Sequence, residues 1–225
     1  MSHQTVTPRG FAALLGPRRW AALLDAGHLR SYHPGATLLR QGDDGGFVLA
    51  VSNGRIAVFG GDADGGEILL ALRGSGDLVG ELALASGSRT ATVRAVDRCT
   101  AHAIPAPAFR SFLNTHNAHA AYADYLAVKL SETVPYSVRQ VHRDPLTRVA
   151  RLLWDLLSLE GNTPSSSHRV PLSQEALAKA LGLARSTVAE QIAELRRTDV
   201  LGPGPRIVVS DPAALARHAD IAMGP

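Results

Sequence analysis

Residues 80–90 combine side chains that could bind a charged ligand. Gly80 and Glu81 precede a short apolar stretch, and a short helix opening there would offer free backbone N–H groups to an anion. Arg89 would supply a planar guanidinium for phosphate oxygens, and Thr90 would add a hydroxyl donor. Glu81 could accept a hydrogen bond from a ribose 2′-hydroxyl. These residue types predict an anion site that also has a carboxylate for a sugar.

Residues 172–195 show the pattern of two helices joined by a sharp turn. Ser173 is a good N-cap, Gly182 fits the turn, and Arg185 would stand near the start of the second helix. The apolar positions expected to face inward are Leu177, Leu181, Val188, Ile192 and Leu195. The pattern is typical of a helix-turn-helix, whose second helix can place an arginine against guanine O6 and N7 in the major groove.

The residues on either side of this motif extend the prediction. Residues 169–171 and 200–209 have the composition of the strands and turn of a wing, which makes the whole a winged helix-turn-helix. An ordinary helical hairpin with a glycine turn is the alternative, and the wing argues against it. The positive charges expected against DNA are Arg185, Arg196, Arg197 and Arg206.

The elements that must position the first site lie between residues 30 and 104. Short apolar runs alternate there with Gly, Asp and Asn turns, as in an antiparallel sandwich or barrel. The expected strands are residues 37–39, 47–51, 55–59, 67–72 and 91–95. Asn53-Gly54 and Asp64-Gly65 are the strongest hairpin signals, because a type I′ turn needs two residues that tolerate positive φ.

Helical periodicity precedes and follows this β region. Residues 9–29 are expected to be helical, and a long helix is expected from about residue 118 to 142. Its apolar stripe consists of Leu126, Leu130, Val134, Val138 and Val141. A second copy of the chain is the expected cover for this stripe, giving a homodimer, and packing wholly on the chain's own β domain is the alternative. Pro135 should kink or interrupt the helix.

Asp144-Pro145 marks the expected domain boundary, because Asp is a good N-cap and Pro a good first helical residue.

The length of 225 residues fits one large or two small domains. The composition, with 45% apolar and 19% charged residues, is typical of a globular protein. The net charge of +3 neither requires nor excludes a nucleic acid. No apolar run is long enough to span a bilayer, and residues 1–10 carry no secretion signal, so a cytoplasmic protein with no membrane contact is expected.

Several classes of chemistry are excluded or disfavoured. Cys99 is the single cysteine, which rules out an internal disulfide and a four-cysteine iron–sulfur cluster within one chain, and it is expected to be a buried apolar side chain. His116 and His119 have a metal-compatible spacing but no third ligand, so a solvated surface pair is expected. No nucleophile elbow, phosphate-binding P-loop or zinc-protease motif occurs. We expect no enzyme, no catalytic residue, no metal site and no required cofactor.

These stretches together resemble the cyclic-AMP receptor protein / fumarate-nitrate regulator (Crp/Fnr) family of bacterial transcription regulators over nearly the full chain. Residues 173–188 resemble the family's DNA-binding motif, and residues 76–95 look like its phosphate-binding cassette. The resemblance implies an α+β fold: an N-terminal β-roll (a jelly roll of the cyclic-nucleotide-binding kind), a long dimerisation helix and a C-terminal winged helix-turn-helix. The matching division is 1–117, 118–144 and 145–225.

The resemblance also implies contacts and partners. The implied effector contacts are Gly80, Glu81, Leu82 through its backbone, Arg89, Thr90 and Thr133. The implied DNA contacts are Ser173, Gln174, Arg185, Ser186, Thr187, Glu190 and Arg206. The expected function is a homodimeric regulator that binds double-stranded DNA and contacts RNA polymerase, with a cyclic nucleotide such as cyclic AMP as effector.

Three departures from the family pattern leave alternatives open. Glu81 and Arg89 are eight positions apart, a shorter loop than in nucleotide-binding members, and Val134 replaces a partner-subunit serine that contacts adenine. Glu190 replaces a base-reading arginine and could accept from cytosine N4, so the operator should differ. Glu81 and Arg89 could instead form an internal ion pair in a protein without nucleotide. The chain would then have another effector or none, or would regulate a protein partner.

Overall fold

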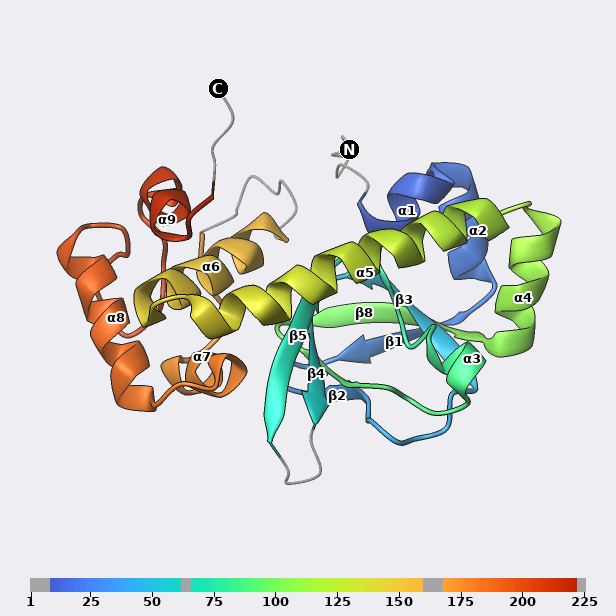
Figure 1. The fold of residues 1–225 in the computed structure, drawn as a ribbon. Coiled ribbons are helices and arrows are strands. Elements are labelled where there is room, and N and C mark those ends of the chain that lie inside the picture. Colours follow the sequence, from blue (N-terminus) through green and yellow to red (C-terminus); the bar gives the residue numbers. More distant parts are fainter. Residues whose placement is uncertain (1–8, 62–65, 160–167, 222–225) are drawn as a thin grey trace.

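The computed structural model describes residues 9–61, 66–159 and 168–221, and the side chains of residues 133–142 lie outside this description. Its elements are α1 (Gly10–Leu15), α2 (Pro17–Asp25), β1 (His28–Tyr32), β2 (Thr37–Leu39), β3 (Phe47–Asn53), β4 (Ile56–Gly61), β5 (Glu67–Arg73), β6 (Leu78–Val79), α3 (Ala83–Ser86), β7 (Thr92–Ala95), β8 (Cys99–Pro105), α4 (Ala106–Thr115), α5 (His119–His142), α6 (Pro145–Ser158), α7 (Gln174–Leu181), α8 (Arg185–Arg197) and α9 (Pro212–His218). Figure 1 shows the β region beside a smaller helical region, with α5 running across both.

The β region consists of two four-stranded antiparallel sheets. The first has the strand order β1-β8-β3-β6 and the second β2-β7-β4-β5. Leucine, isoleucine, valine and alanine side chains from both sheets meet between them, as do Cys99 and the half-buried aromatic rings of Tyr32 and Phe47. This is the predicted β-roll, and its mainly aliphatic core follows from the scarcity of aromatic residues.

One turn prediction was wrong. Asn53-Gly54 joins β3 to β4, but these strands lie in different sheets and do not pair. Gly54 has φ of +88°, and a Cβ there would lie 2.5 Å from the carbonyl oxygen of Arg98. The tight turn therefore carries the chain from one sheet to the other. Asp64-Gly65 lies outside the described residues, although the strands that flank it, β4 and β5, do pair.

The long helix α5 forms as predicted and is helical throughout, so Pro135 does not interrupt it. Its first half packs on the β-roll through Tyr125, which is 2% exposed and lies in one apolar cluster with Phe11, Leu78 and Phe109. Leu130 is 65% exposed in the single chain. The helix therefore uses one face for its own β-roll and leaves part of its apolar stripe uncovered.

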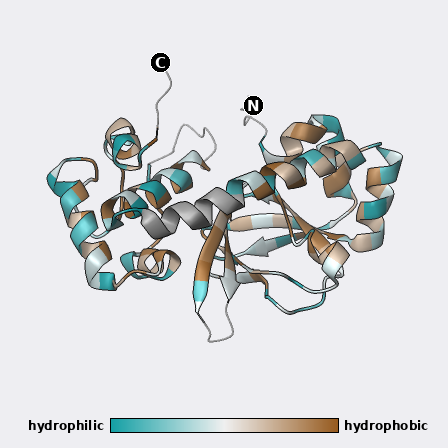
Figure 2. Ribbon diagram, in the orientation of Figure 1, coloured by the Kyte–Doolittle hydropathy of each residue, from teal (hydrophilic) through white to brown (hydrophobic). Residues whose placement is uncertain are grey.

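The helix α6 begins at Pro145 with Asp144 as its N-cap, as the Asp144-Pro145 signal predicts. Asp144 accepts a hydrogen bond from the Thr147 backbone N–H at 3.1 Å and Pro145 is the first helical residue. The capping bonds to Thr147 lower the pKa of Asp144. Helices α7 and α8 pack on α6 around Leu177, Val188 and Ile192, and α8 is largely hydrophilic on the visible side in Figure 2.

The two regions share one continuous apolar core. Phe59 of β4 and Leu69 of β5 lie in the same buried cluster as the side chains of α6, α7 and α8. Two polar contacts accompany it. Arg55 donates to the Leu156 carbonyl oxygen at 2.9 Å, and Lys179 of α7 forms an ion pair with Glu67 of β5 at 3.0 Å. The helix-turn-helix is thus docked directly against the second sheet.

Candidate functional site

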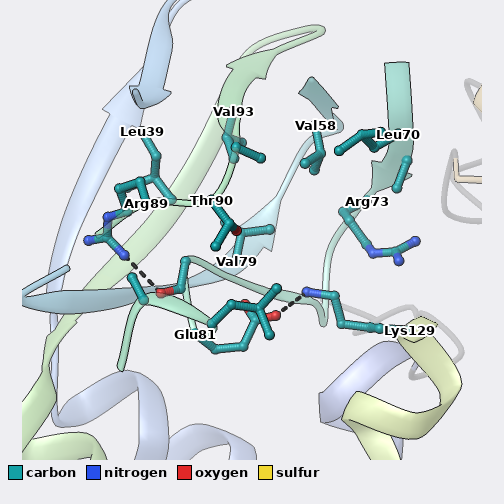
Figure 3. A pocket seen from close by; sticks show the side chains of 15 residues that line it. Leu39, Val58, Leu70, Arg73, Val79, Glu81, Arg89, Thr90, Val93 and Lys129 are labelled. Carbon is teal, nitrogen blue, oxygen red and sulfur yellow. Dashed lines mark hydrogen bonds and ion pairs between the residues drawn. The ribbon is translucent and has the colours of Figure 1, made fainter. Parts of the chain in front are cut away.

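A cavity of about 220 Å³ lies between the β-roll and α5. It is lined by Leu39, Val58, Leu70, Ala71, Arg73, Val79, Gly80, Glu81, Leu82, Ala83, Arg89, Thr90, Ala91, Val93 and Lys129. All of the effector contacts expected from residues 80–90 therefore reach one cavity (Figure 3). Thr133, the remaining expected contact, lies on α5 among the residues whose side chains are outside the described part.

Arg89 is a buried cation at one end of this cavity. It is 3% exposed, its Nη1 donates to the Gly80 carbonyl oxygen at 2.8 Å, and its guanidinium lies 4.5 Å from the centre of the Phe47 ring. Burial lowers the pKa of Arg89, an effect that the charges of Glu81 and Asp43 oppose. Among the described residues, no carboxylate forms an ion pair with Arg89. An anionic ligand would stabilise such a buried cation.

Glu81 does not form the internal ion pair with Arg89 that was one alternative. Its Oε1 accepts instead from the ammonium group of Lys129 at 2.6 Å, and the carboxylate side chain is 2% exposed. Lys129 stands on α5 and also donates to the Leu78 carbonyl oxygen at 3.0 Å. The carboxylate is therefore held in place by the long helix and not by the guanidinium of its own loop.

Three residues that line the cavity have a buried polar atom without a hydrogen-bond partner in the described part of the protein. Oε2 of Glu81 is an acceptor, and Nη2 of Arg89 and Nε of Arg73 are donors. Unsatisfied buried groups cost roughly 1–3 kcal/mol each and mark places where a ligand can form the missing bonds. A hydroxyl could donate to Glu81 and an anionic oxygen could accept from Arg89, which is the chemistry of a sugar phosphate.

The local backbone differs from the expectation of a helix that opens at Gly80 and Glu81. The helix α3 begins at Ala83 and has only 4 residues, so it contributes little as an anion site. Gly80 has another role: its φ is +81°, and a Cβ there would lie 2.4 Å from the Arg89 guanidinium. Only glycine lets the chain pass this close to the buried arginine.

Three residues of this region were not found by sequence reasoning: Arg73, Tyr125 and Lys129. The Tyr125 hydroxyl accepts from the Leu78 backbone N–H at 2.9 Å, and burial raises its pKa well above the usual value. Tyr125, Lys129 and Thr133 follow one another at four-residue spacing, which places them on one face of α5. Counting back from Thr133 in steps of four residues would have predicted Lys129 and Tyr125 as further residues of the site.

The predicted DNA-reading residues lie on the exposed side of the helix-turn-helix. Ser173 caps α7 by accepting from the Ala176 N–H at 3.1 Å, and Gly182 makes the turn with φ of +60°. Arg185, Ser186 and Glu190 are exposed on α8, and Arg206 is exposed in the wing, whereas Gln174 and Thr187 are half-buried.

The wing forms between residues 201 and 209, with a β-bridge between Leu201 and Val209. Arg196 was expected against DNA, but its guanidinium donates to the wing carbonyl oxygens of Gly204 at 2.6 Å and Gly202 at 3.3 Å. The side chain of Arg197 pairs with Glu194 at 2.6 Å. Arg196 thus holds the wing against α8, whereas Arg185 and Arg206 are exposed.

The predicted DNA-reading residues border the β-roll in this arrangement. Ser173, Gln174, Arg185 and Arg206 line a large cavity together with residues of the β-roll, among them Arg55. The helix-turn-helix therefore faces its own N-terminal region across this space.

The remaining sequence features have structural roles. Cys99 is fully buried, as expected, and burial beside Asp97 raises the pKa of its thiol to about 12. The His119 ring bonds to Asn114 at 2.8 Å, and the described residues contain no cluster of metal-ligating side chains. Within the same ranges, no helix combines the length and apolar character needed to cross a membrane.

Family models match both halves of the chain. The model of the cyclic nucleotide-binding domain matches residues 29–116, and the model of the Crp-like helix-turn-helix domain matches residues 147–218. The first range contains the cavity residues from Gly80 to Thr90, and the second contains all of α7 and α8.

Curated relatives and solved structures agree with these matches. The CRP-like cAMP-activated global transcriptional regulator of Mycobacterium tuberculosis is 27% identical over 190 residues, which cover 82% of this chain and 85% of that protein. The cAMP-activated global transcriptional regulator CRP of Salmonella typhimurium is 23% identical, covering 81% and 89%. A CRP-family regulator of Thermus thermophilus shares the fold with a TM-score of 0.73, 24% identity and coverage of 87% and 98%. The chain belongs to the Crp/Fnr family of transcription regulators, with a cyclic nucleotide-binding domain followed by a Crp-like helix-turn-helix domain.

Proposed function

We propose that this protein is a cytoplasmic homodimeric regulator, not an enzyme, whose DNA affinity changes when a cyclic mononucleotide binds between the β-roll and α5. The observation that carries the effector proposal is the pair of unsatisfied buried atoms, Glu81 Oε2 and Arg89 Nη2, in one cavity. The named activity of the curated relatives, which are cAMP-activated, supports the same class of ligand.

The size of the cavity favours a small nucleotide. Its volume of about 220 Å³ lies just below the usual range of roughly 300–1,000 Å³ for ligand pockets. In the proposed pose the phosphate contacts Arg89, Gly80, Thr90 and the Leu82 backbone, and the ribose hydroxyl donates to Glu81. The base then extends towards α5, where Thr133 is the proposed contact of the family pattern.

The dimer and the DNA contacts are part of the same proposal. Exposed Leu130 on α5 supports pairing with a second copy along this helix. The proposed domains are 1–117, 118–144 and 145–225, and each protomer would place α8 in one major groove. Ser173, Gln174, Ser186 and Thr187 would help to fix the register on double-stranded DNA, and the bound dimer would contact RNA polymerase.

The proposed effect of the nucleotide is to release the docked helix-turn-helix. An ion pair of Lys129 with Glu81 links α5 to the β-roll, and an ion pair of Glu67 with Lys179 links β5 to α7. A ligand that bonds to Glu81 and Arg89 alters the contact between the β-roll and α5, and this biases the equilibrium between docked and released arrangements.

Isothermal titration calorimetry with cyclic AMP and cyclic GMP tests the effector proposal. We expect one of the two to bind with a micromolar dissociation constant, and Arg89→Gln to weaken that binding at least tenfold because the phosphate loses its charged partner. Arg110→Gln, which removes an exposed cation of α4, is the matched control. Absence of binding at millimolar concentration of both nucleotides would contradict the effector proposal and leave the DNA-binding proposal standing.

A further inference from the structure

The end of the cavity opposite Arg89 holds a second buried cation. Arg73, the last residue of β5, is 7% exposed, and its Nη1 donates to the Leu72 carbonyl oxygen at 3.0 Å. The same nitrogen forms an ion pair with Glu132 of α5 at 3.0 Å. The Nε of Arg73 is buried without an acceptor among the described residues. A ligand acceptor at this end would satisfy that N–H.

The surroundings of Arg73 fit a planar ring better than a second phosphate. Val58, Leu70 and Val93 line the cavity with apolar surface. Figure 3 shows Val58 and Leu70 near Arg73, and Arg89 with Leu39 at the other end. A nucleotide with its phosphate at Arg89 and its ribose at Glu81 would therefore place its base between these apolar side chains, with one edge towards Arg73.

The Arg73 guanidinium can discriminate between guanine and adenine by the hydrogen-bonding groups on their edges. Arginine donates and does not accept, and its N–H groups form a rigid planar fork. Guanine offers two acceptors on one edge, O6 and N7, whereas adenine combines the N7 acceptor with an N6 donor. An arginine fork can donate to both guanine atoms, but it would face the adenine amino group without a bond to it.

Building on the proposed cyclic-nucleotide function, we propose that Arg73 reads the base and that the effector is a guanine cyclic mononucleotide in preference to cyclic AMP. Lys129, a third cation of the cavity, also only donates, and the Glu132 carboxylate near this end is already paired with Arg73, so this end presents cationic donors to the base. In this proposal the preference for guanine over adenine depends on the Arg73 side chain. A substitution at Arg73 can therefore change this preference without removing the phosphate contact at Arg89.

Calorimetric titration of the full-length protein with cyclic GMP, cyclic AMP and cyclic IMP tests the proposal. Cyclic IMP keeps O6 and N7 but lacks the 2-amino group of guanine, so it isolates the edge that Arg73 would read. We expect cyclic GMP and cyclic IMP to bind roughly tenfold more tightly than cyclic AMP. Arg73→Leu should weaken both of them about tenfold and leave cyclic AMP unchanged, which removes the preference.

Glu132→Gln is the matched control because it removes the ion-pair partner and keeps the guanidinium. It should retain the preference for guanine, and thermal unfolding checks that each variant is folded. If Arg73→Leu does not fold, Arg73→Lys keeps the charge but not the fork and should reduce the preference. Equal or tighter binding of cyclic AMP by the wild-type protein overturns the proposal, as does an equal loss of all three nucleotides in Arg73→Leu. Failure of every nucleotide to bind instead overturns the proposed function itself.

Discussion

Individual residues show how the same side-chain type takes different roles in different surroundings. Arg89 and Arg73 are buried in one cavity, Arg196 is bound to the carbonyl oxygens of the wing, and Arg185 is exposed at the start of α8. Of these four arginines, Arg185 is the one proposed to contact a base edge. The net charge of +3 therefore says little about DNA binding, because what matters is which cations are already engaged within the fold.

Replacing Arg185 should weaken specific DNA binding more than non-specific binding. Arg185→Ala is expected to cost about 1–3 kcal/mol on the preferred operator and to relax the preference at one base position, since a bidentate contact with guanine is lost. Binding-site selection followed by fluorescence anisotropy measures both effects. Arg110→Ala removes the same charge from α4 and should change neither. An unchanged operator preference in Arg185→Ala would refute the assignment.

Among the elements, α5 links the parts of the molecule. Figure 1 shows it passing from the helices α1, α2 and α4 to the C-terminal region. Tyr125 and Lys129 use one face of the helix to hold the β-roll, and Leu130 remains exposed on another. If the cavity binds the proposed effector and the exposed face pairs with a second protomer, this helix can transmit a change between them.

Placing a charge on the exposed stripe of α5 should dissociate the dimer. Leu130→Glu would bury an unpaired carboxylate in the apolar seam, so the dimer dissociation constant should rise by on the order of tenfold or more. Sedimentation velocity over a concentration series measures it. Val128→Glu is the matched control, because Val128 is 49% exposed but lies two residues away, on nearly the opposite side of the helix. If both variants remain dimeric, the α5 seam is not the interface.

At the scale of the whole molecule, the contact between β5 and α7 fixes the position of the helix-turn-helix. Glu67 accepts two hydrogen bonds from Arg94, at 2.6 and 2.8 Å, and pairs with Lys179 at 3.0 Å. These bonds, chiefly that from Arg94, lower the pKa of Glu67 from 4.5 to about 2. The stabilisation from this carboxylate is therefore complete above about pH 4.5 and is lost as the pH falls towards 2.

Breaking this pair should increase DNA binding in the absence of effector. If docking through Glu67 and Lys179 contributes about 1 kcal/mol, Glu67→Gln shifts the balance towards the released arrangement roughly fivefold. Lys179→Gln breaks the same pair with the opposite change of charge. Anisotropy titrations should show tighter binding for both variants. Opposite effects of the two would show that net charge, and not docking, controls the affinity.

Much of the architecture could be predicted because it depends on local patterns. The N-cap of Asp144, the turn at Gly182 and the alternating apolar runs of the β-roll are decided by residues close together in the chain. The expectation that Asn53-Gly54 forms a hairpin was wrong because it, too, rested on a local pattern. A tight turn is a local property, but whether the strands beside it pair or separate into two sheets depends on the packing of distant strands.

The sequence by itself determined the order of the main elements, the N-caps Asp144 and Ser173, and the stretch from Gly80 to Thr90 that reaches the cavity. Only the tertiary structure decided that Lys129 holds Glu81, that Arg73 closes the far end of that cavity, and that Glu67 binds the helix-turn-helix. The ion pairs of Lys129 with Glu81, of Lys179 with Glu67 and of Arg73 with Glu132 each join residues at least 48 positions apart in the chain. Such contacts depend on how helices and sheets pack, because no short-range periodicity relates the two partners.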